Sequence, residues 1–151
     1  MLVVCKISKN TNIKNFNKIK VKNFNIKRRS INPLFLLYQI IDLVKIIKEF
    51  QPDIIQNTAL KPIIIGSLSS LFVGKKINVI NCVVGLGYIY INKNLKNLLL
   101  KKIINLLFFV LSKKKNYTTV FQNKDDKEYF KKRNLIDSNR TNVIKGSGVN
   151  V

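Results

Sequence analysis

Four short segments of this chain combine cations, glycines or helix-start residues in patterns that bind phosphate groups or sugar hydroxyls. Backbone N–H groups at a glycine turn or in the first turn of a helix attract anions, and a neighbouring lysine or arginine adds charge. Each segment follows an apolar run that is typical of a buried strand. The segments are Arg28–Pro33, Asn57–Pro62, Gly85–Tyr88 and Lys145–Gly148.

Apolar periodicity alternates along the chain between a strand pattern and a helix pattern. Short apolar runs are separated by stretches in which apolar residues recur every three or four positions. This order predicts an α/β fold in which a parallel sheet is flanked by helices. We expect strands over 2–7, 19–24, 53–56, 77–84, 117–121 and 142–144, and helices over 33–50, 61–73, 95–111 and 125–133.

The position of the four segments follows from this fold. Open parallel sheets bind their ligands at the carboxyl ends of the strands. All four segments follow such ends, so we expect them to share one edge of one sheet. Asn32 precedes Pro33 and is predicted to cap the first helix, and Asp125 is predicted to cap the last one.

The composition combines a large positive charge with enough apolar residues for a folded domain. The 151 residues include 28 Lys and Arg against 7 Asp and Glu, a formal net charge of +21, and 46% of them are apolar. The apolar content excludes a disordered basic tail, and no apolar run is long enough for a membrane-spanning helix. The charge indicates a polyanionic partner, either nucleic acid, anionic lipid or a phosphorylated small molecule.

Much of this charge reflects residues that share A/T-rich codons, since the chain has 24 Lys, 22 Ile and 20 Asn. Only four cations are Arg, the residue that nucleic-acid readers favour for bidentate contacts, and this argues against nucleic acid as the partner. Two alternatives stay open on composition alone. They are a basic nucleic-acid-binding module and a non-catalytic peripheral membrane protein.

The two cysteines, Cys5 and Cys82, are far apart in apolar runs, and the chain has no histidine. Neither cysteine has metal-ligating neighbours at a suitable spacing, so we expect no metal site and two reduced thiols, as in the cytoplasm. Residues 1–5 are too short for the apolar region of a signal peptide. We therefore expect a cytoplasmic protein, free in solution or peripheral on the inner face of the plasma membrane.

Six blocks of this sequence resemble one enzyme family in their order and spacing. They are similar to the N-terminal domain of family-4 GT-B glycosyltransferases, especially the bacterial branch that builds polysaccharides and lipid-linked glycans. The resemblance covers residues 1–151. The blocks are Arg29–Leu34, Pro52–Ile55, Lys61–Pro62 with Gly66–Leu68, Val84–Tyr88, Phe121–Asn123 with Asp125–Asp126, and Gly146–Val149.

The resemblance implies a two-domain enzyme and a reaction. Family members pair two Rossmann-like domains across a cleft, the N-terminal one holding the acceptor and the C-terminal one the nucleotide-sugar. The implied reaction transfers a hexose-type sugar from a nucleotide-sugar co-substrate to a lipid-linked or polysaccharide acceptor. It retains the configuration of the sugar and uses no metal or other cofactor.

The resemblance also assigns roles to positions of this chain. Asn123 and Asp126 match the family pattern, and Asp126 has a second interpretation as a helix-start residue. Gly146, Ser147 and Gly148 would lie at the crossing into the donor domain. The acceptor side of the cleft would be lined by Arg29, Asn32, Lys61, Gly85, Leu86 and Gly87.

The chain departs from the family pattern at both ends and at one internal position. The family has a strand and a glycine-rich turn before the point that corresponds to Met1, and a donor domain after Val151. Gln56 stands where the family frequently has histidine, and its amide cannot act as a general acid or base near neutral pH. We therefore expect an enzyme that is inactive alone, with a donor domain that is missing or separate.

Residues 93–115 allow two interpretations. An apolar helix bracketed by lysines can lie in the headgroup layer of an anionic membrane. The same pattern describes a core helix whose lysines reach out to solvent. Both hold together if one face of the helix packs on the sheet and the other contacts lipid.

Overall fold

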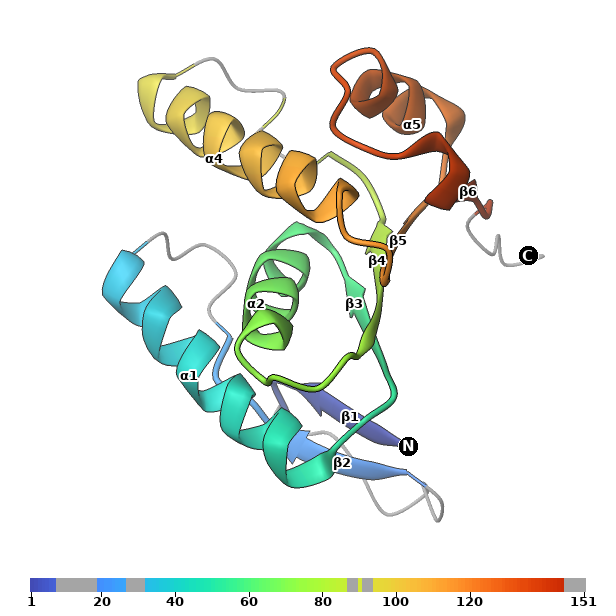
Figure 1. Cartoon of the computed structure of the whole chain (residues 1–151). Coiled ribbons are helices and arrows are strands. Elements are labelled where there is room, and N and C mark those ends of the chain that lie inside the picture. The colour runs from blue at the N-terminus through green and yellow to red at the C-terminus, as the bar shows by residue number, and fades with distance from the viewer. Residues whose placement is uncertain (8–18, 27–31, 87–89, 91–93, 146–151) are drawn as a thin grey trace, which may run out of the picture.

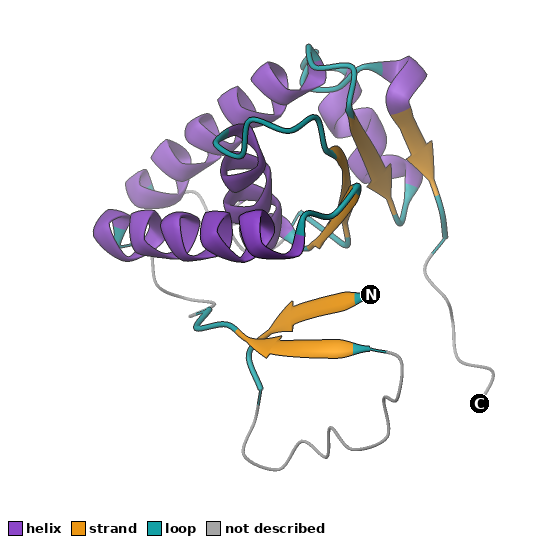
Figure 2. Ribbon diagram, turned by 60° about the horizontal axis from the view of Figure 1, so that its bottom comes forward, coloured by secondary structure: helices purple, strands orange, loops and turns teal. Residues whose placement is uncertain are grey.

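The computed structural model describes residues 1–7, 19–26, 32–86, 90 and 94–145. After an initial pair of strands, helices and strands alternate (Figures 1 and 2), which confirms the predicted α/β class. In chain order the elements are β1 (Leu2–Cys5), β2 (Lys20–Asn23), α1 (Pro33–Phe50), β3 (Ile54–Thr58), α2 (Leu60–Leu71), β4 (Asn78–Val83), α4 (Leu95–Ser112), β5 (Tyr117–Phe121), α5 (Lys124–Lys131), a 3₁₀ turn (Ser138–Arg140) and β6 (Thr141–Val143).

The six described strands form two parallel sheets, and the expectation of a single sheet is wrong for this part of the chain. β1 pairs with β2, and the second sheet has the order β3–β4–β5–β6. In the second sheet Ile54 lies opposite Asn78 and Thr58 lies opposite Cys82. Between the described parts of β1 and β3 there is no backbone hydrogen bond, so helices α1 and α2, which pack against each other, join the two sheets.

The helices lie on one side of the larger sheet (Figure 1). Side chains alternate along a strand, so Asn57 of β3 is buried beneath α2 while Gln56 and Thr58 point the other way and are exposed. Parallel sheets usually carry helices on both faces. Among the described residues, all helices that contact this sheet cover the same face.

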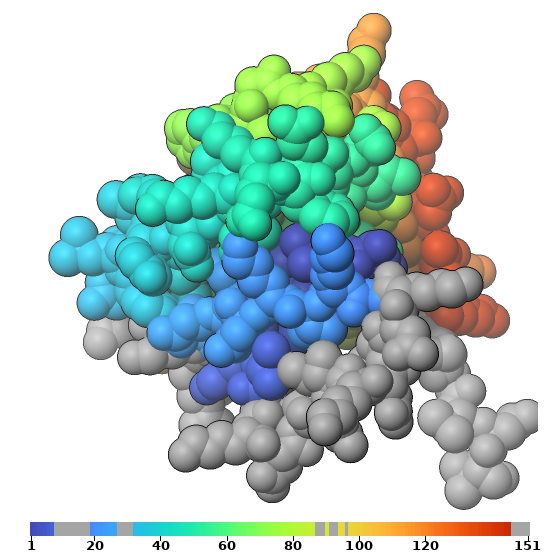
Figure 3. Space-filling model, turned by 90° about the horizontal axis from the view of Figure 1, so that it is seen from below, coloured from blue at the N-terminus to red at the C-terminus, as the bar shows by residue number. Residues whose placement is uncertain are grey.

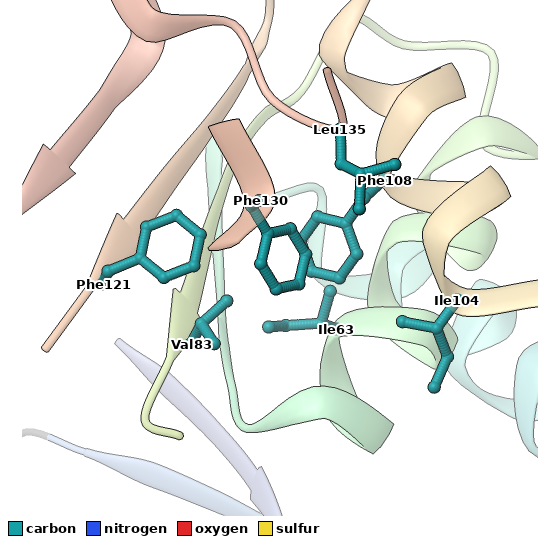
Figure 4. Packing of buried hydrophobic residues seen from close by; sticks show 7 residues of the cluster. All are labelled: Ile63, Val83, Ile104, Phe108, Phe121, Phe130 and Leu135. Carbon is teal, nitrogen blue, oxygen red and sulfur yellow. The ribbon is translucent and has the colours of Figure 1, made fainter. Parts of the chain in front are cut away.

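The main core lies between this face and helices α2, α4 and α5 (Figure 4). Ile63 of α2 and Phe121 of β5 are fully buried, and the rings of Phe108 and Phe130 meet edge to face with centroids 4.8 Å apart. Each buried side chain of this size contributes about 1.5–3 kcal/mol of hydrophobic stabilisation. The cluster therefore fixes α4 and α5 against β4 and β5.

A second core attaches the two-stranded sheet. Phe24, directly after β2, is buried with Ile40 and Ile46 of α1 and Ile65 of α2. Figure 3 shows β1 and β2 beside α1 on one face of the molecule. The smaller sheet is therefore held by packing against helices.

Asparagines begin three of the helices. Asn32 and Asn94 cap α1 and α4 through their side-chain oxygens. Asn123 caps α5, since its Oδ1 accepts a hydrogen bond from the backbone N of Asp126 at 2.7 Å. The prediction that Asp125 caps this helix is wrong, because Asn123 has the extended backbone that a cap requires and Asp125 lies within the first turn.

A buried polar contact sets the distance between α2 and the sheet. Asn81 Oδ1 of β4 accepts hydrogen bonds from Asn57 Nδ2 at 2.9 Å and from Ser67 Oγ at 3.1 Å. Gly66 of α2 lies directly against Asn57, and a Cβ atom at position 66 would collide with the Asn57 amide. Glycine is therefore required here by the close approach of helix and strand.

Replacing Gly66 with alanine should destabilise the domain by about 1–3 kcal/mol, because the new methyl group overpacks a buried contact. The Asn57→Ala change makes room, so Gly66→Ala should cost at least about 0.5 kcal/mol less in that background. Urea unfolding of the single and double variants measures this coupling. Additive costs would contradict the contact between the two positions.

Candidate functional site

Backbone hydrogen bonds align the carboxyl ends of the strands in the larger sheet. Ala59 N, after β3, donates to Cys82 O at 3.0 Å, and Gln122 N, after β5, donates to Val83 O at 3.3 Å. The segments that follow β3, β4 and β5 therefore run along one edge of the sheet. The predicted site residues in these segments are Lys61, Gly85, Leu86, Asn123 and Asp126.

Helix α2 begins at this edge without a side-chain cap, since Ala59 occupies its N-cap position. Lys61 lies in the first turn and is partly buried, and burial lowers the pKa of its ammonium group from the ordinary value. A helix start carries partial positive charge, so a lysine here adds a cation where cations are disfavoured. A bound phosphate or carboxylate would offset both effects.

Ala59 has a backbone conformation that alanine rarely adopts. Its φ of 75° and ψ of 156° lie in a region that is almost restricted to glycine and costs about 1–3 kcal/mol. The conformation is held by two backbone hydrogen bonds, because Ala59 N donates to Cys82 O and Ala59 O accepts from Ile63 N. Strain of this kind is typical of ligand-binding turns.

Gly85, two residues after β4, has open space at its Cα among the described residues. It has a φ of 140°, which side-chain-bearing residues rarely adopt, and apart from its two chain neighbours no atom of the described residues lies within 4 Å of the position that a Cβ atom would take. Leu86 packs against the main core and anchors the turn. A ligand can therefore approach the backbone at Gly85 closely.

The other predicted residues are placed differently. Asn32 follows the smaller sheet, and its Oδ1 accepts from Leu34 N at 3.0 Å, so its side chain caps α1. The structure thus brings Lys61, Gly85 and Leu86 to one edge, whereas Asn32 lies at the start of α1. The predicted residues that lie outside the described residues are Arg29, Gly87, Gly146, Ser147 and Gly148.

Asn123 and Asp126 form a reciprocal pair at the start of α5. Asn123 Nδ2 donates to Asp126 Oδ2 at 2.9 Å, while Asn123 Oδ1 accepts from the Asp126 backbone N. The second contact satisfies one free backbone N–H of the helix start, and the first holds the two side chains together. Helix capping therefore accounts for the contacts that both side chains make.

Gln56 lies on the face of the sheet opposite α2. Its side chain hydrogen-bonds the thiol of Cys82, and burial raises the pKa of that thiol more than the hydrogen bond lowers it. A thiol with a raised pKa is a poor nucleophile at neutral pH. Gln56 therefore orients a neutral thiol here.

The sequence does not predict two features of the structure, the first at this edge and the second in α4. The strain at Ala59 has no sequence signal, because alanine is compatible with a helix start. Asn97, in the first turn of α4, is only 5% exposed, and its Nδ2 has no hydrogen-bond partner among the described residues. The sequence pattern that could have revealed Asn97 is a polar residue on the buried apolar face of α4, which continues to Ile104 and Phe108.

The parallel sheet and its basic, uncapped helix start define a Rossmann-like domain whose edge can hold an anionic group. The chain belongs to the glycosyltransferase 4-like family, which matches residues 1–123, and this confirms the resemblance seen in the sequence. It is 33% identical over 134 residues to the N,N'-diacetylbacillosaminyl-diphospho-undecaprenol alpha-1,3-N-acetylgalactosaminyltransferase of Campylobacter jejuni. That alignment covers 88% of this chain and 35% of the relative, so the chain spans about a third of the relative's length.

Replacing Ala59 with glycine should stabilise the domain by about 1 kcal/mol, because glycine adopts this conformation without strain and the gain exceeds its entropic cost. Urea unfolding measures the change. Asn134→Gly is the matched control, since the φ of 53° at Asn134 lies in the left-handed region that asparagine tolerates. A larger loss of stability in Ala59→Gly than in the control would show that Ala59 is not strained.

Proposed function

We propose that this chain is the acceptor-binding half of a glycosyltransferase that adds a sugar to a lipid-linked glycan. The observation that carries the proposal is the uncapped start of α2, where strained Ala59 and partly buried Lys61 meet at the sheet edge. Membership of the family supports sugar transfer. The Campylobacter relative is named for a diphospho-undecaprenol-linked acceptor, and this supports an acceptor of the same class.

In this proposal the acceptor diphosphate lies against Lys61 and the backbone N–H groups of α2. Charge-assisted hydrogen bonds of this kind are about twice as strong as neutral ones. A phosphate beside Lys61 favours its ammonium form and raises its pKa back toward the ordinary value. The open space at Gly85 admits the sugar next to the diphosphate.

The transfer exchanges one substituent on the anomeric carbon of the donor sugar. An acceptor hydroxyl forms the new bond, the bond to the nucleoside diphosphate breaks, and the hydroxyl proton leaves with that diphosphate. The nucleotide-sugar binds to a second domain, which belongs to the same protein or to a separate chain. The described edge supplies acceptor binding, so this chain alone binds its acceptor without transferring sugar.

Lys61→Gln should weaken binding of a polyprenyl-diphosphate-linked saccharide by about tenfold, since it removes one charge-assisted contact to phosphate. A short, water-soluble prenyl chain keeps membrane binding out of the measurement, which is made by isothermal titration calorimetry. Lys76→Gln is the matched control, because Lys76 is exposed and precedes β4 at the opposite end of the strands. Its affinity should equal that of the unchanged chain.

Two outcomes would overturn the proposal. One is equal loss of affinity in the Lys61 and Lys76 variants, which would show that Lys61 acts only through the net charge of the chain and not through a direct contact with phosphate. The other is binding of a nucleotide-sugar in place of the lipid-linked saccharide, which would make this chain the donor half.

A further inference from the structure

Helix α4 has a second apolar face that is exposed in the structure. One face packs into the main core through Ile104 and Phe108. On the other face large apolar side chains recur every three or four residues, and Leu95 is 82% exposed and Leu106 63% exposed. This face, called the α4 stripe below, consists of Leu95, Leu98, Leu99, Ile103, Leu106 and Phe109.

The α4 stripe is too apolar for an ordinary water-facing surface. Soluble proteins rarely expose large contiguous apolar patches, and those that do usually use them to bind a partner. Leu95, Leu98 and Leu99 line a surface hollow together with Lys102, so the stripe is indented at its start.

The charge around the stripe is mostly positive, and Asp137, which lines a pocket with Phe109 and Lys113, is paired with Arg140 at 2.7 Å. The sequence from residue 54 to residue 124 contains eleven lysines and no aspartate or glutamate. Lys102 is exposed within the stripe, and Lys113 Nζ lies 5.0 Å from the Phe109 ring centroid at its far end. Lys114 and Lys115 are exposed directly beyond. The surface therefore presents apolar side chains flanked by cations.

Helix α1 carries a similar exposed face along its first half, formed by Leu34, Leu37, Tyr38 and Ile41. The first turns of α1 and α4 lie on the same side of the molecule in Figures 1 and 2. Both helices begin after the carboxyl end of a strand. The exposed apolar residues in their first turns, Leu34 and Leu95 among them, therefore follow strand ends.

We propose that the α4 stripe binds the interface of an anionic lipid bilayer, with its leucines among the acyl chains and its lysines at the headgroups. A bilayer offers an apolar layer under a negative surface, which is complementary to this face, and it deforms around the hollow. In the described part of the chain no helix has the length and apolarity to cross a bilayer. Membrane binding does not depend on the proposed acceptor. It would, however, bring the edge of the larger sheet close to a lipid-linked acceptor.

A second copy of the chain fits this face less well. Pairing two α4 stripes would bring Lys102 and Lys113 of each copy close to those of the other. The stripe itself contains no acidic residue to neutralise them, and Asp137 beside Lys113 is already paired with Arg140. Like charges placed together in an interface oppose association.

A single tryptophan provides a direct test, because the chain has none of its own. Leu106→Trp should shift its fluorescence emission to shorter wavelength when vesicles of phosphatidylcholine and phosphatidylglycerol are added. Phe72→Trp is the control, since Phe72 is 66% exposed at the end of α2, away from the stripe. Its emission should not change with vesicles.

Charge insertion tests the stripe itself. Leu99→Asp combined with Leu106→Asp should weaken co-sedimentation with the anionic vesicles by at least about tenfold, because the apolar contact is lost. The control pair is Phe72→Asp with Ile144→Asp, which changes the net charge equally at exposed positions elsewhere. It should bind within about twofold of the unchanged chain, and circular dichroism confirms that each variant is folded.

Three results would overturn this proposal. The first is equal binding to anionic vesicles and to pure phosphatidylcholine. The second is equal weakening by the two aspartate pairs. The third combines two observations. The unchanged chain does not bind vesicles, and in analytical ultracentrifugation it forms a dimer that the combined Leu99→Asp and Leu106→Asp changes dissociate. Since no acceptor is present in these experiments, their failure leaves acceptor binding at Lys61 untouched.

Discussion

Asn81 is buried between α2 and the larger sheet, where its side-chain oxygen accepts hydrogen bonds from Asn57 and Ser67. One turn further along the helix, the hydroxyls of Ser70 and Tyr117 are 2.7 Å apart, and Tyr117 also donates to the Ser67 carbonyl at 3.2 Å. Burial raises the pKa of Tyr117, so the phenol stays protonated at neutral pH. An unpaired buried polar group costs about 1–3 kcal/mol, so α2 cannot slide or rotate without a large penalty.

Because α2 is held in a fixed position, its first turn cannot move to relieve the unfavourable free energy at Lys61 and Ala59. The lowered pKa of Lys61 means that its ammonium form is less stable in the folded chain than in the unfolded one. This penalty is present at neutral pH and disappears as the pH rises through the lowered pKa toward the ordinary value. The strain at Ala59 acts in the same direction. An anion bound at the edge would offset the electrostatic part, which is the physical sense in which this edge is prepared for a ligand.

The sequence predicts the bounds of helices and strands better than it predicts which of them lie next to each other. Strand β5 has its predicted bounds, and α1 and α4 begin at the predicted residues, because capping asparagines precede clear helical periods. Short apolar runs do not specify which strands pair, so the division into two sheets was not foreseeable. Nor does periodicity show which face of α4 is buried, since apolar residues surround that helix. Lys61 and Gly85 were predictable because they follow strands, whereas the conformation of Ala59 depends on a hydrogen bond to Cys82.

The contact between Gly66 and Asn57 links two positions that lie on different elements. A larger residue at 66 becomes acceptable only after position 57 has lost its amide, and that loss removes one donor from Asn81. Every route of single substitutions therefore passes through a less stable chain. Descendants of this sequence should change the two positions jointly or keep both, so the pair behaves as one inherited character.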